Sequence, residues 1–159
     1  MQHAKILTAS EMRAERDTLR AAGKKLVFTN GCFDLMHNGH VTYLKFAREQ
    51  GDALCVGLNS DASVRGNKGE LRPVVDENNR AAVLAALRCV DYVVIFDEKE
   101  PKELIAQILP DILVKGADWA HYVSGREIVE ANGGKVVLAE LVPGLSSTNI
   151  IKKILDGYR

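Results

Sequence analysis

The sequence is poor in cysteine, contains no long apolar run and has no excess of charge of either sign. Its three cysteines, Cys32, Cys55 and Cys89, are an odd number without a C-x-x-C pair, so they predict reduced thiols rather than a disulfide framework. No stretch of about 18 consecutive apolar residues is present, and the first fifteen residues lack the apolar centre of a signal peptide. These absences lead us to expect a cytoplasmic protein.

The net charge of the sequence limits the kinds of binding partner to expect. Twenty-one Lys and Arg side chains balance twenty-one Asp and Glu side chains, so the formal net charge is zero. Domains that bind nucleic acid or an anionic membrane usually carry a basic excess, and we expect neither as a partner. Apolar residues make up 47% of the 159 residues, which excludes a disordered chain and suffices for the core of one domain.

Short apolar runs of β-prone residues alternate with segments of helical period. Because parallel strands need crossover connections and are buried on both faces, this alternation predicts an α/β fold with a doubly wound, five-stranded parallel sheet. We divide the chain into an N-terminal helical extension, residues 1–23, which has the capping-box spacing of Thr8 and Glu11, and one domain, residues 24–159. The predicted strands are residues 26–29, 53–58, 92–96, 112–114 and 136–138.

The loop after the first predicted strand concentrates the unusual residues of the chain. It reads TNGCFDLMHNGH over residues 29–40 and leads into a predicted helix. Ligands of doubly wound folds bind beyond the carboxyl ends of the strands, and a helix N-terminus offers free N–H groups to phosphates. His37 and His40 are three residues apart, so in a helical turn they point the same way and can donate hydrogen bonds to a phosphate. Gly39 between them allows a ligand to approach the helix closely.

Other interpretations of this loop stay open. The histidines can be surface or capping residues that bind no ligand. Cys32, His37 and His40 can instead bind zinc, although no fourth ligand lies at a short spacing. Two roles are equally compatible with Asp34. It can belong to the binding site, or it can brace the loop with a carboxylate that accepts backbone hydrogen bonds.

The run GCFDLMHNGH, residues 31–40, resembles the G-x-F-D-x-x-H-x-G-H signature of the cytidylyltransferase-like nucleotidyltransferase superfamily. Its heptose 1-phosphate adenylyltransferase branch is the most similar. That resemblance implies a Rossmann-like HxGH nucleotidyltransferase fold over residues 24–159. It extends to VGLNSD at 56–61, KGELRP at 68–73, Arg80, AALRCVDYVVIFD at 85–97, DILVKGAD at 111–118 and GLSSTNI at 144–150.

The resemblance also implies a reaction. AMP would pass from ATP to D-glycero-β-D-manno-heptose 1-phosphate by direct in-line attack on the α-phosphate, giving ADP-heptose and pyrophosphate. Mg²⁺ would bridge the phosphate oxygens without a dedicated protein cage, so no metal ligand is expected among the side chains. The partners implied are these small molecules and, as is common in the superfamily, a second copy of the chain in a homodimer.

Roles for individual residues follow from the same resemblance. His37 and His40 would contact the triphosphate, and Lys68, in a polar loop, would close over the β- and γ-phosphates. Arg80 would bind the acceptor phosphate, and Asp118 a hydroxyl of the ribose or the heptose. The residues implied to bind the nucleotide are Thr29, Asn30, Gly31, Cys32, Phe33, Asp34, Asn38, Gly39, Lys115, Gly116, Asp118, Ser146, Ser147 and Thr148.

Several of these residues also have plain structural interpretations. Lys68 can be an exposed loop lysine, and Arg80 can pair with Asp76 or Glu77 of its own helix. One hydroxyl of Ser146-Ser147-Thr148 can cap the last helix.

Two rival functions also remain. A cytidylyltransferase acting on a small alcohol phosphate such as glycerol 3-phosphate is disfavoured, because that branch carries an arginine where this chain has LVPG at 141–144. The choice of ATP over CTP rests on the resemblance alone. The other rival is a non-catalytic nucleotide-binding subunit, which would bind nucleotide without releasing pyrophosphate.

Overall fold

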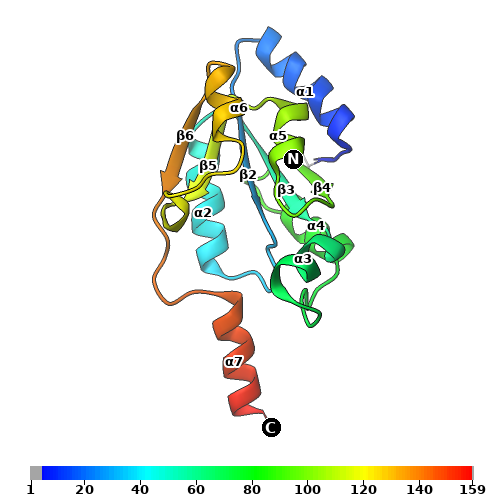
Figure 1. Cartoon of the computed structure of the whole chain (residues 1–159), viewed down its shortest axis with the longest axis vertical. Coiled ribbons are helices and arrows are strands. Elements are labelled where there is room, and N and C mark those ends of the chain that lie inside the picture. Colours follow the sequence, from blue (N-terminus) through cyan, green and yellow to red (C-terminus); the bar gives the residue numbers. More distant parts are fainter. Residues whose placement is uncertain (1–4, 159) are drawn as a thin grey trace.

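One parallel sheet forms the centre of the computed structural model of the chain, which describes residues 5–158 (Figure 1). Its strands are β1 (Lys5–Ile6), β2 (Leu26–Gly31), β3 (Ala53–Asn59), β4 (Tyr92–Phe96), β5 (Ile112–Gly116) and β6 (Lys135–Ala139). The order across the sheet is β1-β4-β3-β2-β5-β6, and all neighbouring pairs are parallel. The predicted α/β fold with a doubly wound parallel sheet is confirmed, but the sheet has six strands instead of five.

The additional strand is β1, which is only two residues long. It adds to the edge of the sheet by pairing with β4, with Lys5 opposite Tyr92. It lies in the segment expected to be a helical extension, of which residues 1–4 fall outside the described residues. Two residues are too few to show the alternation of side chains by which a strand is recognised in a sequence.

The predicted helix of that N-terminal segment is α1 (Ala9–Ala21). Its capping box is present: the Glu11 N–H donates to the Thr8 hydroxyl at 3.2 Å, and the Thr8 N–H donates to the Glu11 carboxylate at 3.1 Å. Met12 of α1 is fully buried against the central strands. α1 therefore packs into the same core as the strands.

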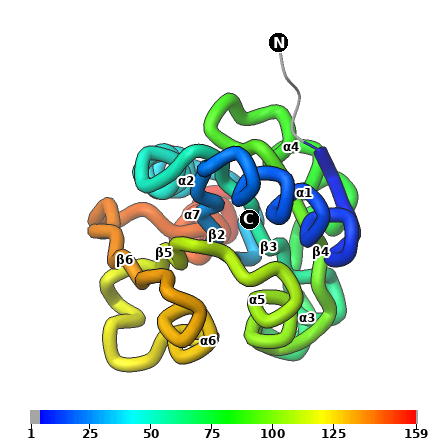
Figure 2. The backbone as a smooth tube through the Cα atoms, turned by 90° about the horizontal axis from the view of Figure 1, so that it is seen from above, coloured from blue at the N-terminus to red at the C-terminus, as the bar shows by residue number. Residues whose placement is uncertain are grey.

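Helices cover both faces of the sheet. The others are α2 (Asn38–Glu49), α3 (Asp61–Lys68), α4 (Glu77–Ala85), α5 (Lys102–Ile108), α6 (Arg126–Ala131) and α7 (Ser147–Gly157). Figure 2 shows α2 and α4 on one side of the sheet and α5 and α6 on the other. Successive strand residues point to opposite faces, so Val27 packs with α2 and α4 whereas Phe28 packs with α1, α5 and α6. Because both faces are covered, the three central strands β2, β3 and β4 consist mostly of buried apolar residues.

Two local predictions are wrong. Lys68 does not lie in a loop, because α3 continues to this residue. Ser124 and Glu127 also have the spacing of a capping box, which predicts that Ser124 caps a helix. No such cap forms, since the backbone of Gly125 is left-handed, with a φ of 86°, and α6 starts after it without a side-chain cap. In both places a tertiary arrangement decides the boundary, which short sequence patterns do not encode.

The connectivity creates a switch point at β2. The chain runs from β2 through β3 to β4 on one side and then crosses to β5 and β6 on the other. Beyond the carboxyl ends of β2 and β5, the start of α2 and the start of α7 approach each other, while the rest of α7 extends away from the sheet (Figure 1). Such switch points are where open α/β sheets bind ligands. None of the helices within residues 5–158 has the length and apolar composition of a membrane span.

Candidate active site

A cavity of about 540 Å³ lies at this switch point. It is lined by the signature loop, by residues from the ends of α3 and β5, and by the segment that leads into α7. Thr29, Asn38 and Arg80 are expected site residues that do not line it. The expected site residues that do are Asn30, Gly31, Cys32, Phe33, Asp34, His37, Gly39, His40, Lys68, Lys115, Gly116, Asp118, Ser146, Ser147 and Thr148.

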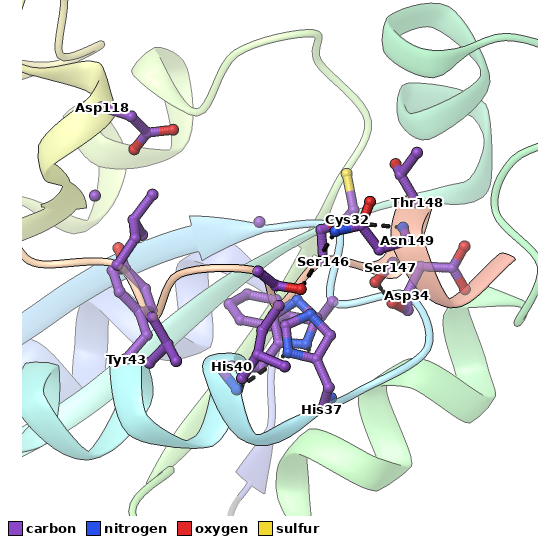
Figure 3. A pocket seen from close by; sticks show the side chains of 18 of the residues that line it. Cys32, Asp34, His37, His40, Tyr43, Asp118, Ser146, Ser147, Thr148 and Asn149 are labelled. Atoms are coloured by element: carbon purple, nitrogen blue, oxygen red, sulfur yellow. Dashed lines mark hydrogen bonds between the residues drawn. The ribbon is translucent and has the colours of Figure 1, made fainter. Parts of the chain in front are cut away.

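The two histidines of the signature lie together at the start of α2 (Figure 3). Their rings are stacked, with centroids 3.9 Å apart and planes inclined by 26°. The Gly39 N–H donates to Nδ1 of His37 at 3.1 Å, and the His37 N–H donates to Nδ1 of His40 at 3.3 Å. Both imidazoles thus cap the helix and line the cavity, as their spacing of three residues predicts.

These bonds determine the protonation of both rings. A nitrogen that accepts a hydrogen bond carries no proton, so each neutral ring has its proton on Nε2. Burial lowers the pKa of His40 to about 4, and the nearby His37 and Lys68 reinforce this effect. Burial also lowers the pKa of His37. At neutral pH the site therefore holds two uncharged imidazoles whose Nε2–H groups are donors.

Asp34 braces the loop that carries the histidines. Burial acts to raise the pKa of its carboxyl, but hydrogen bonds from the N–H groups of Val74 and Val75 and from Arg72 outweigh burial and hold the pKa below its usual value. The three donors lie 2.8, 3.0 and 2.9 Å from the carboxylate oxygens. The carboxylate is thus engaged as the bracing interpretation expects. It connects the signature loop to the segment between α3 and α4.

Arg80 is buried beside the cavity rather than in its wall. Its guanidinium donates to the Asp61 carboxylate at 2.7 Å. It also donates to three backbone carbonyls, those of Val75, Cys32 and Asn59, at 2.8, 2.7 and 2.8 Å. Four of its donor contacts are therefore made to protein, and it pairs with neither acidic residue at the start of its own helix. The structure places Arg80 as a brace between the ends of β2, β3 and the α3–α4 segment.

The end of β5 contributes a lysine, a carboxylate and an aromatic ring. Lys115 Nζ donates to the Asn30 side chain at 3.1 Å and lies 5.4 Å from the centre of the Trp119 ring. Burial lowers the pKa of Lys115, and Asp118 opposes this effect. A Cβ at Gly116 would lie 2.6 Å from Oδ1 of Asp118, so a side chain at this residue would displace the Asp118 carboxylate.

The start of α7 closes another side of the cavity. The Ser146 hydroxyl accepts the Asn149 N–H at 3.0 Å and is the N-cap, as one interpretation expects. The Ser147 hydroxyl donates to the backbone carbonyl of Asp34 and so connects α7 to the signature loop. Thr148 lies exposed in the first turn.

Tyr43 lines the cavity but was not predicted. Its hydroxyl donates to the Val114 carbonyl at 3.1 Å, so the Thr29 hydroxyl, 2.6 Å away, donates to Tyr43 in turn. Burial raises the pKa of Tyr43 to about 12. Its position one helical turn after His40 is the signal that could have identified it. Apolar residues 141–145 were also missed as wall residues, because nothing in their sequence indicates a site.

Metal-binding chemistry can be tested against the side chains present. Among residues 5–158, no three His, Cys, Asp or Glu side chains converge as a metal-ion cluster. Cys32 therefore does not join His37 and His40 in the cluster that the zinc interpretation requires. Its thiol lines the cavity, and burial raises its pKa.

Comparisons with known proteins identify a matching family model and several similar proteins. The family model described as Cytidylyltransferase-like matches residues 28–153. The Bifunctional protein HldE of Syntrophotalea carbinolica is 55% identical over 155 residues, which are 97% of this chain and 32% of that protein. This chain thus spans about a third of the length of that relative.

Solved structures add two similarities. The lipopolysaccharide core biosynthesis protein from Thermoplasma volcanium GSS1 is 30% identical, with a TM-score of 0.62 over 76% of this chain and 98% of that one. The pantoate-beta-alanine ligase from Francisella tularensis is 19% identical, with a TM-score of 0.64 over 96% of this chain and 78% of that one. The second similarity concerns the fold alone, and it agrees with the Rossmann-like architecture.

Proposed function

The chain belongs to the cytidylyltransferase-like family, and from this premise we propose that it transfers AMP from ATP to D-glycero-β-D-manno-heptose 1-phosphate. The observation that carries the proposal is the stacked pair His37 and His40, whose neutral Nε2–H donors stand at a helix N-terminus. The motifs shared with heptose 1-phosphate adenylyltransferases support the acceptor. So does the similarity to a lipopolysaccharide core biosynthesis protein.

The reaction forms one bond and breaks one. An oxygen of the acceptor phosphate attacks the α-phosphorus of ATP, and the bond from that phosphorus to the oxygen shared with the β-phosphate breaks. Pyrophosphate leaves with the electron pair, and the products are ADP-heptose and pyrophosphate. No group of the protein becomes covalently attached, so the protein acts by positioning the reactants and stabilising charge.

His37 and His40 stabilise the charge that develops on the α-phosphate. Their Nε2–H groups provide fixed donors, which need no reorganisation when the charge grows. His40 is the main contributor, because it is the more buried of the two imidazoles and its pKa is the more strongly lowered. Asp34 and Arg80 hold the loop that carries both rings and act as positioning residues.

Two lysines, Asp118 and the first turn of α7 have the remaining proposed roles. Lys68, at the end of α3, neutralises the β- and γ-phosphates and the leaving pyrophosphate. Lys115 lies where the nucleotide and the acceptor phosphate meet. Asp118 accepts hydrogen bonds from the ribose hydroxyls, and the first turn of α7 with Ser147 and Thr148 contacts phosphate oxygens.

Mg²⁺ bound with ATP would neutralise part of the phosphate charge. The described side chains offer it no dedicated set of ligands. The oxygens of Asp34 are already occupied by Arg72 and two N–H groups, and no acidic cluster exists within residues 5–158.

Pyrophosphate release tests the proposal, with ATP and CTP each offered with heptose 1-phosphate and with glycerol 3-phosphate. We expect release only for ATP with heptose 1-phosphate. Dependence on CTP would move the chain to the cytidylyltransferase branch. Nucleotide binding without release in all four mixtures would support a non-catalytic subunit and overturn the proposal.

A further inference from the structure

A second cavity of about 420 Å³ adjoins the first. Both cavities are bordered by the end of β2, by Lys68, by Lys115 and by Trp119. The proposed function uses only the first cavity and leaves the occupant of the second unassigned. The residues that line only the second cavity are Asn59, Asn67, Lys99, Glu100, Pro101, Tyr122 and Ser124.

Glu100 is the centre of the polar wall of this second cavity. The Tyr122 hydroxyl donates to Oε2 of Glu100 at 2.9 Å, and the Ser124 hydroxyl donates to the same oxygen at 3.3 Å. Within residues 5–158, no donor is bonded to the other oxygen, Oε1. The carboxylate is therefore held in place by one oxygen while the other remains able to accept hydrogen bonds from a ligand.

The charges of the two walls differ in kind. The shared border carries two cations, Lys68 and Lys115, and no anion, whereas the unshared wall carries one cation, Lys99, and one anion, Glu100, together with hydroxyls and amides. A ligand with a phosphate at one end and hydroxyls at the other matches this distribution. Glu100 repels a phosphate, so the phosphate end of such a ligand is directed toward the shared border.

Direct transfer requires such a border. The acceptor oxygen and the α-phosphorus must approach to about 3–3.5 Å, although both reactants are anions. Cations that belong to both cavities offset this repulsion at the place of attack. The first cavity contains the histidines and both helix N-termini that suit the triphosphate, which leaves the second cavity for the acceptor.

Resting on the proposed function, we propose that the second cavity is the acceptor site. There Glu100, oriented by Tyr122 and Ser124, selects a polyhydroxylated sugar phosphate by accepting hydrogen bonds from sugar hydroxyls. The site discriminates against acceptor molecules that are too short to reach this carboxylate, such as glycerol 3-phosphate. A carboxylate suits this task, because a site that bonds hydroxyls rejects ligands that lack them.

The variants that test the proposal are Glu100→Gln and Tyr122→Phe in the full chain. Glu98→Gln is the matched control. It removes the same charge two residues earlier in the chain, and Glu98 lines neither cavity. We expect Glu100→Gln to raise the KM for heptose 1-phosphate about tenfold or more, the usual effect of losing a hydrogen bond to a charged group. The KM for ATP stays within about twofold, and Glu98→Gln leaves both constants unchanged. Tyr122→Phe moves only the KM for the acceptor, to a smaller extent.

Binding measured without turnover separates this proposal from the proposed function. Trp119, the single tryptophan, borders both cavities, so its fluorescence reports titration with heptose 1-phosphate in the absence of ATP. We expect Kd to rise about tenfold in Glu100→Gln and to stay constant in Glu98→Gln. Equal affinity of Glu100→Gln and the unaltered protein, or no response to the sugar phosphate at all, would overturn the acceptor site. Normal binding without pyrophosphate release would instead overturn only the proposed function.

Discussion

Nδ1 of His40 accepts the backbone N–H of His37 at 3.3 Å, and this one bond joins the start of α2 to the proposed chemistry. It caps the helix and at the same time leaves the proton of the ring on Nε2, toward the cavity. A structural and a catalytic interpretation of the histidines are therefore compatible. The signature spacing is needed because the third residue after an N-cap is the one whose side chain reaches back to the N-cap N–H.

Replacement of His40 separates these two contributions. We expect His40→Ala to lower kcat about 100-fold or more, the usual effect of removing one donor from a developing charge, with a smaller change in the affinity for ATP. His40→Asn should lower kcat similarly, because its Oδ1 can accept the His37 N–H in place of Nδ1 but the side chain ends before the position of Nε2 and places no donor there. The measurements are steady-state pyrophosphate release and thermal unfolding. An unchanged kcat in either variant would remove His40 from the mechanism.

The pKa of His40 gives a prediction about pH. Its folded value of about 4 lies below the ordinary value of 6.5, so the unfolded chain binds more protons between these values. The stabilisation from neutral His40 is complete above pH 6.5 and is lost as the pH falls toward 4. Activity should fall in the same direction, because protonation at Nδ1 keeps the Nε2–H but removes the acceptor of the His37 N–H, which holds the ring in place. Titration of the His40 ring proton signals by NMR should show a midpoint near pH 4, and a midpoint near 6.5 would contradict this account.

The brace at Asp34 predicts an effect on stability. Phe33 and Leu35 on either side have φ values of 47° and 49°, a left-handed backbone that costs about 1 kcal/mol or more per residue. The bonds to Asp34 offset this cost. Asp34→Asn removes the charge opposite Arg72 and turns an amide donor toward other donors, so we expect a loss of about 3 kcal/mol in the free energy of unfolding. Urea unfolding checks the value. Asp156→Asn on the exposed surface of α7 is the control and should change the free energy little.

The sequence predicts the site well where the site is local. The signature loop, its position after a strand and the common direction of His37 and His40 all depend on residues within one segment, so spacing suffices to predict them. The place of Arg80 could not be predicted, because its partners come from four separate positions along the chain, Cys32, Asn59, Asp61 and Val75. A lone cation in an apolar helix indicates only that some acceptor must be present.

Glu100 and its partners show the same limit. Tyr122 and Ser124 lie in another loop more than twenty residues later, and the contact of all three depends on how α5 and α6 pack. The strand β1 could not be predicted for a different reason, since two residues carry no measurable pattern. What was predicted is therefore local in sequence, and what was missed is made by the tertiary fold.

Arg80 provides the test between a phosphate ligand and a brace. Lysine keeps the positive charge but cannot reach Asp61 and three carbonyls at once, because it presents one ammonium in place of a planar fork. If Arg80 is a brace, Arg80→Lys leaves buried carbonyls unpaired, and we expect the free energy of unfolding to fall by about 2–4 kcal/mol. The loss of kcat should then be accompanied by changes in KM for both substrates, since the loop at Cys32 borders both cavities. If Arg80 instead binds the acceptor phosphate, only the KM for the acceptor rises and thermal unfolding stays unchanged. Steady-state kinetics and urea unfolding on the same preparation distinguish the two, and full stability with an isolated acceptor defect would refute the brace.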